Sequence, residues 1–89
     1  MIIWDPEKYK KLKEERGILL EEIAELILKK EYVKIIKNQS KPWQRIFIVD
    51  YKNYIHLVPY VIDEEQNIFI KTAYPSRKYM KLFGKGGQK

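Results

Sequence analysis

The chain has 89 residues, of which 45% are hydrophobic, so it has room for one domain with a single small core. It contains no cysteine and only one histidine, His56, which excludes a disulfide framework and leaves a zinc site short of ligands. No apolar run approaches the roughly 20 residues that span a bilayer, and no signal peptide is visible. We therefore expect a cytoplasmic protein that needs no cofactor or metal and has no membrane partner.

The N-terminal region is predicted to form a short edge strand and a helix. Residues 2–4 are apolar, and Asp5 and Pro6 then stand where an N-cap and a first helical residue are expected. The helix should run to about Arg16. It should stop at Gly17, which can adopt the left-handed conformation of a C-cap.

A second helix is predicted almost immediately afterwards. Apolar residues recur at helical spacing from Leu20 to Ile27, and glutamates fill the opposite face. Leu19 occupies the place where a serine or threonine cap is expected, so the start of this helix is weakly specified. Two short helices joined by so tight a turn form a hairpin that cannot bury its apolar face alone.

The rest of the chain is predicted to form a sheet. Four β-rich runs are separated by turn signals: residues 33–36, 45–51, 54–62 and 67–74. The last three should form an antiparallel meander. The predicted fold is therefore α+β, with an N-terminal helical hairpin packed on one face of a small antiparallel sheet and a short C-terminal helix or tail. We assign residues 1–83 to one domain and residues 84–89 to a flexible basic tail.

The alternation in residues 54–61 sorts side chains onto two faces. Ile55, Leu57 and Val61 share one face, whereas tyrosines 54 and 60 share the other with His56 and Val58. We expect the aliphatic face to meet the helices. The opposite face would then be an open platform on which nucleic-acid bases could stack.

Positive charge is concentrated in the second part of the chain. Residues 1–31 hold seven Lys/Arg against eight Asp/Glu, a net of −1, whereas residues 32–89 hold eleven against four, a net of +7. This segregation favours a polyanion such as RNA, or an acidic partner. The structural alternative is an ordinary lysine-rich solvated surface.

Four motifs in order give the chain a family resemblance. They are Trp4-Asp5-Pro6-Glu7-Lys8, Glu15-Arg16-Gly17-Ile18, the glutamate-rich second helix, and the strand end Pro75-Ser76-Arg77-Lys78. Together they resemble the BrnT family of type II toxins, within the RelE/ParE-like superfamily, from about Trp4 to Phe83. The chain departs from that pattern at Leu19, where a hydroxyl cap is usual, and from Val33 to Trp43.

The resemblance implies a ribonuclease toxin that arrests translation, acts on RNA that is free or ribosome-associated, and is neutralised by a cognate DNA-binding antitoxin. It also implies a homodimer or a toxin–antitoxin heterotetramer as the candidate assemblies. By position, its basic residues fall on Arg77 and Arg45. We expect the antitoxin to cover the basic surface, with Trp4 and the first helix as alternative contacts.

Metal-free RNA cleavage needs a base for the 2′-hydroxyl, an acid for the leaving oxygen and cations for the phosphorane. His56 is the default acid or base because its unperturbed pKa lies near neutrality, and the fork of Arg77 can hold two phosphate oxygens. The candidate catalytic residues are Arg77, Arg45 and His56. The candidate substrate-binding residues are Lys71, Lys78, Tyr79, Trp43, Tyr54 and Tyr60.

These residues also have structural explanations. His56 can be a hydrogen-bonded histidine on a half-buried strand, and Lys71 can be an edge lysine that blocks aggregation. Tyr54 and Tyr60 can be packing residues. The main alternative function is a non-catalytic basic module that binds an acidic protein or nucleic acid, and a further one is a related toxin that acts on DNA gyrase.

Overall fold

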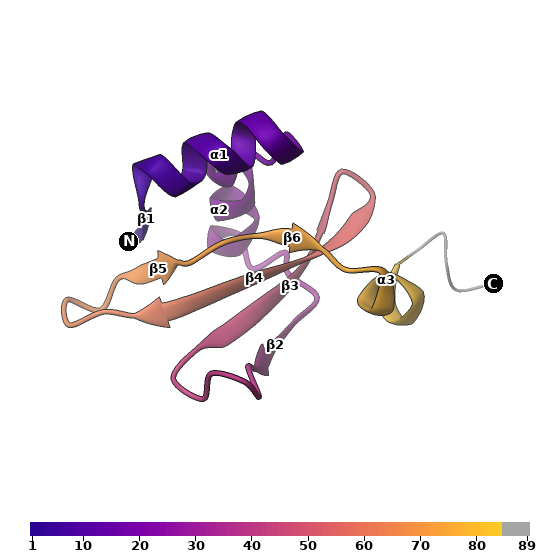
Figure 1. The fold of residues 1–89 in the computed structure, drawn as a ribbon. Coiled ribbons are helices and arrows are strands. Elements are labelled where there is room, and N and C mark those ends of the chain that lie inside the picture. The colour runs from indigo at the N-terminus through magenta and orange to yellow at the C-terminus, as the bar shows by residue number, and fades with distance from the viewer. Residues whose placement is uncertain (85–89) are drawn as a thin grey trace.

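A computed structural model describes residues 1–84 and has an α+β fold (Figure 1). Its elements are β1 (Ile2–Trp4), α1 (Pro6–Arg16), α2 (Leu20–Leu28), β2 (Lys34–Lys37), β3 (Arg45–Tyr51), β4 (Tyr54–Ile62), β5 (Ile68–Ile70), β6 (Tyr74–Pro75) and α3 (Arg77–Phe83). No helix in this part of the chain is long and apolar enough to cross a membrane. Of the predicted tail, residues 85–89 lie outside the described residues.

The sheet has the strand order β1-β5-β4-β3-β2, and β6 also pairs with β4. β3, β4 and β5 are antiparallel neighbours, as predicted for the meander, and β2 pairs with β3 in the same antiparallel sense. β1 lies parallel to β5, with Ile3 opposite Phe69, so the prediction of a purely antiparallel sheet was wrong at this edge. The parallel pairing is possible because α1 and the intervening elements supply a long crossover between the two strands.

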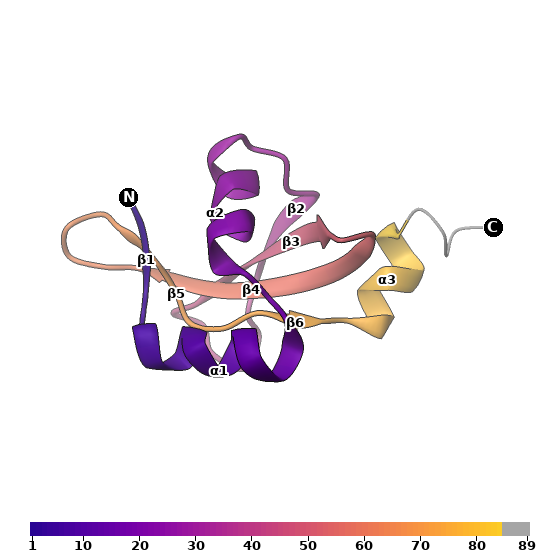
Figure 2. The same ribbon diagram turned by 90° about the horizontal axis from the view of Figure 1, so that it is seen from above.

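Helix α1 has the ends that its sequence predicts. The Asp5 side chain accepts a hydrogen bond from the Glu7 amide at 2.9 Å, and Gly17 closes the helix at a φ of 66°. The Tyr9 hydroxyl donates to Glu21 and so links α1 to α2. Both views place α1 along the β5–β6 side of the sheet (Figures 1 and 2). In both, α2 lies at a steep angle to α1.

Helix α2 begins without a side-chain cap of its own, and a tyrosine from the sheet supplies the missing contact. The Tyr51 hydroxyl accepts from the Leu19 amide at 3.1 Å and donates to Glu22 at 2.7 Å. Glu22 is the third helical residue, which in a capping box would bond the cap amide directly. Here the tyrosine hydroxyl bridges the two groups and thereby ties the start of α2 to β3.

The long strand expected over residues 67–74 is divided into β5 and β6, and a proline explains the division. Tyr60 pairs with Ile70 and Leu57 pairs with Tyr74, so three residues, 71–73, stand opposite only two on β4. This is a one-residue bulge. It lies opposite Pro59, whose carbonyl accepts from the Lys71 amide but which has no N–H to donate in return.

The two faces of β4 are used in the opposite way to our expectation. Val58 and Tyr60 pack with α2 in one core, whereas Ile55 and Leu57 belong to a second core under α3. Tyr60 is only 7% exposed and its ring stacks on Phe47 at 4.3 Å. The prediction of an open tyrosine platform was therefore wrong, and Tyr60 is a packing residue. Both faces of the strand are apolar, so alternation alone could not say which one meets the helices.

The bridge at the start of α2 predicts a specific loss of stability in Tyr51→Phe. Removing one hydroxyl breaks both hydrogen bonds, so we expect the free energy of unfolding to fall by about 1 kcal/mol. Urea denaturation followed by circular dichroism would measure it. Tyr54→Phe is the matched control, because the Tyr54 hydroxyl makes no hydrogen bond within residues 1–84. Equal stability of the two variants would contradict the bridge.

Candidate functional site

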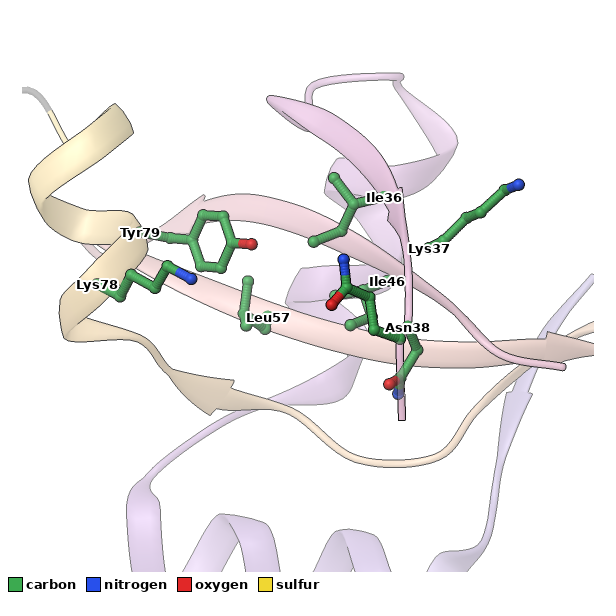
Figure 3. Close-up of a pocket in the computed structure, with 8 residues that line it drawn as sticks. Ile36, Lys37, Asn38, Ile46, Leu57, Lys78 and Tyr79 are labelled. Atoms are coloured by element: carbon green, nitrogen blue, oxygen red, sulfur yellow. The ribbon is translucent and has the colours of Figure 1, made fainter. Parts of the chain in front are cut away.

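A groove of about 500 Å³ opens between α3 and the β2 end of the sheet (Figure 3). Its floor is apolar and its walls are polar or basic. The lining residues are Ile36, Lys37, Asn38, Gln39, Ile46, Leu57, Lys78 and Tyr79. In Figure 3 the Tyr79 ring and the Lys78 side chain extend from α3 toward the floor, whereas Lys37 points away from it.

Helix α3 fixes the position of the first wall. Ser76 caps the helix by accepting from the Tyr79 amide at 3.2 Å, and the Ser76 amide donates to the carbonyl of Ile55. The Tyr79 ring lies parallel to Phe83, with centroids 6.1 Å apart, and both pack on the core under α3. This packing fixes the Tyr79 side chain and holds its phenol at the groove.

The second wall is the loop that leads from β2 to β3, between two of the predicted strands. Asn38 organises it: its side-chain oxygen accepts from the amides of Ser40 and Lys41, and its side-chain nitrogen donates to Gln44 at 3.1 Å. Gln44 is buried, so the loop is anchored at both ends. This geometry turns Trp43 outward, where it is 68% exposed.

The groove has a positive rim. Lys78 lies in the first turn of α3 next to the exposed Arg77, and its Nζ is 5.5 Å from the centre of the Tyr79 ring. Among residues 1–84 the one ion pair joins Lys29 to Glu25, so no carboxylate there neutralises these cations. Cations beside a fixed aromatic ring and two amides suit a phosphodiester with an adjacent base.

His56 does not reach this groove. It is 8% exposed, its Nδ1 donates to the Tyr54 carbonyl at 2.8 Å, and the rings of Tyr51 and Tyr54 stand edge-on to it. Burial lowers its pKa below the usual 6.5, although the backbone hydrogen bond opposes this shift. Its neighbour Leu57 lines the groove, and successive residues of a strand point to opposite faces. His56 therefore faces the side of the sheet that α2 covers.

Arg45 and Trp43 line a different hollow, at the far end of β4. Arg45 pairs with Tyr60, four residues along the strand from His56, which is about 13 Å at the usual rise per residue. The predicted catalytic residues Arg77, Arg45 and His56 are thus not brought together. Of the three, only Arg77 belongs to α3, where it directly precedes Lys78 and Tyr79, which line the groove.

The remaining predicted residues are spread over the molecule. Lys71 is half-buried at the bulge, with its Nζ 5.1 Å from the Phe69 ring centre. Tyr54 is half-buried beside His56, and Trp4 is half-buried with its ring edge-on to Tyr9 at 5.6 Å. None of the three lines the groove.

Sequence reasoning missed most of the groove. Asn38 and Gln39 lie between two predicted strands, and Ile36 and Ile46 lie within them, so neither pair carries a local signal of a site. The available signal was the change from an apolar pair, Ile35-Ile36, to a polar turn that returns directly into another strand.

No family model, curated protein or solved structure matches this chain. The resemblance to BrnT toxins therefore rests on the four short motifs. Within the described residues, no group of three or more metal-ligating side chains lies close enough together to hold a metal ion.

The environment of His56 predicts a pH dependence of stability. Because its pKa is lowered in the folded chain, the unfolded chain binds the proton more readily, so stability should fall as pH drops below about 6.5 toward the folded pKa. We expect the free energy of unfolding to decline between pH 7 and 5 in the wild type, measured by urea denaturation at each pH. His56→Gln should remove the part of this decline that histidine protonation causes, because His56 is the sole histidine. Parallel pH profiles of the two proteins would contradict this account.

Proposed function

We propose that this protein is a metal-independent endoribonuclease toxin of the BrnT type that binds RNA in the groove between α3 and the β2–β3 loop and acts in the cytoplasm. The observation that carries the proposal is that Lys78 and Tyr79 line one concave surface, with the exposed Arg77 directly before Lys78 on α3. The motif resemblance supplies the class of activity. A cognate antitoxin that masks this groove would neutralise it.

In the proposed reaction the 2′-hydroxyl oxygen of RNA bonds to the adjacent phosphorus while the bond to the 5′-oxygen breaks. The products are a 2′,3′-cyclic phosphate and a 5′-hydroxyl. Lys78 and Arg77 would stabilise the charge that develops on the phosphorane oxygens. The Tyr79 hydroxyl would donate a proton to the leaving 5′-oxygen, and water would accept the proton of the 2′-hydroxyl.

This assignment keeps Arg77, Lys78 and Tyr79 from the sequence prediction and leaves out His56 and Arg45. The side chain of His56 faces the opposite side of the sheet, and Arg45 lines the separate hollow. The Tyr79 phenol takes over the acid role because packing against Phe83 holds it at the groove, beside the cation of Lys78.

A non-catalytic RNA-binding module is the second candidate, and one observation favours it. The groove is lined by cations, amides and a phenol, but no imidazole or carboxylate lines it. Such a surface binds a phosphodiester without needing to cleave it. Binding of this kind would weaken in proportion to the charge removed and to added salt.

Tyr79→Phe separates the two functions. We expect cleavage to slow by about 100-fold or more, the typical contribution of a positioned proton donor, while RNA affinity stays within about twofold. Cleavage is measured by mapping new 5′ ends in cells that express each protein and with a fluorescent RNA in vitro, and binding is measured by anisotropy. Arg77→Ala should weaken both.

Tyr54→Phe is the matched control, because it removes the same hydroxyl from a tyrosine that does not line the groove. This variant should cleave RNA like the wild type. His56→Gln should also cleave like the wild type. No cleavage by folded wild-type protein that still binds RNA would establish the binding module instead. Undiminished cleavage by Tyr79→Phe would remove Tyr79 from the mechanism.

A further inference from the structure

A second surface, on the side of the sheet that α2 covers, leaves apolar side chains exposed to solvent. One hollow of about 560 Å³ is lined by Ile35, Trp43, Arg45, Tyr60, Val61 and Ile62. A second hollow, of about 360 Å³, begins at the C-terminal end of α2 and shares Ile35, Tyr60 and Ile62 with the first. The two hollows form one continuous apolar strip, on which Trp43 is 68% exposed, Leu28 70% and Ile62 53%.

The strip has unneutralised positive charge along one side. Lys37 on β2 stands directly opposite Arg45 on β3, and like charges in this register repel each other. Within residues 1–84 neither cation pairs with a carboxylate, and Lys30 at the α2 end is likewise unpaired. An anionic group placed between Lys37 and Arg45 would relieve the repulsion.

The strip is not positive throughout. Beyond Ile62 the β4–β5 turn carries Asp63, Glu64 and Glu65. Asp63 is occupied in the turn, where it accepts from the amides of Glu65 and Asn67 and from the Asn67 side chain. The acidic turn confines the attraction for anions to the β2–β3 side, so a ligand would have one preferred orientation.

We propose that this strip is a docking surface for an acidic amphipathic helix of a partner protein. The helix would lay its apolar side chains across Ile35, Tyr60 and Ile62 and place carboxylates beside Lys37 and Arg45. Rows of apolar anchors spaced along a groove are the usual way in which such a helix is bound. Trp43, exposed at the rim, would close over one end of it.

Three other occupants fit less well. RNA would match the cations but would gain little from the aliphatic strip around Ile35 and Ile62. A second copy of this chain brings its own net charge of +6 and a second Lys37–Arg45 pair. Residues 85–89 contain no apolar side chain that could cover the strip.

This inference goes beyond the proposed function and does not depend on it. The docking strip lies on the side of the sheet that α2 covers, whereas the RNA groove lies under α3. Lys37 borders both surfaces, but its side chain points away from the groove floor (Figure 3). RNA cleavage and helix docking can therefore be measured separately, and either can fail while the other holds.

The test uses the full chain and a fluorescein-labelled 18-residue helical peptide with leucines on one face and glutamates on the other. We expect binding by anisotropy and a shift of the Trp43 indole N–H resonance. Ile62→Lys and Trp43→Ala should each weaken binding by about tenfold or more. Arg45→Ala should weaken it less, and by an amount that shrinks at high salt.

The controls match each change. Leu82→Lys alters an apolar side chain of similar exposure, 55%, on α3, and Lys11→Ala removes a cation from α1; neither should affect peptide binding. Unchanged amide spectra would show that each variant is folded. Equal binding of a scrambled peptide of the same composition would overturn the proposal, as would displacement of the peptide by a 12-nucleotide RNA. Sedimentation of the protein alone as a dimer that Ile62→Lys dissociates would assign the strip to self-association instead.

Discussion

The β3–β4 ribbon is apolar on both faces, and the need to cover both faces shapes the rest of the molecule. The N-terminal helices cover one face with Ile23 and Ile27, and α3 covers the other with Met80 and Phe83. The helices are short: α2 has nine residues and α3 has seven. Neither covers its face completely, so each face keeps an open region. One is the groove beside Tyr79 and the other is the strip around Ile62.

The elements predicted correctly are those with local signals. Asp5, Pro6 and Gly17 define α1, and turn residues on either side define β3 and β4. What the sequence could not provide was the choice of face on β4, because Ile55 and Leu57 are as apolar as Val58 and Tyr60. That choice depends on tertiary contacts: Val58 and Tyr60 pack with α2, and Ile55 and Leu57 pack under α3. The sequence did contain two signals of tertiary effects. Leu19 provides no side-chain cap for α2, and a proline lies within β4.

The same limit applies to the candidate site. Arg77, Lys78 and Tyr79 are adjacent in sequence, so their proximity follows from the chain itself. His56 and Arg45 were grouped with them by chemical type, and the strand register and the alternation of side chains separate them. The opposite wall of the groove comes from Asn38 and its loop, about forty residues away in sequence. Only the three-dimensional pairing of β2 with β3 brings that loop to the groove.

The most direct test of the central claim, that the groove under α3 is the RNA site, is a chemical-shift map. A short single-stranded RNA with a 2′-O-methyl group at each position lacks the attacking hydroxyl and so would bind without being cleaved. Amide and side-chain resonances would report where it lies. The account predicts that shifts cluster at Asn38, Gln39, Lys78 and Tyr79 and spare the indole of Trp43. Shifts centred on Trp43 and Arg45, with the α3 resonances unmoved, would contradict it.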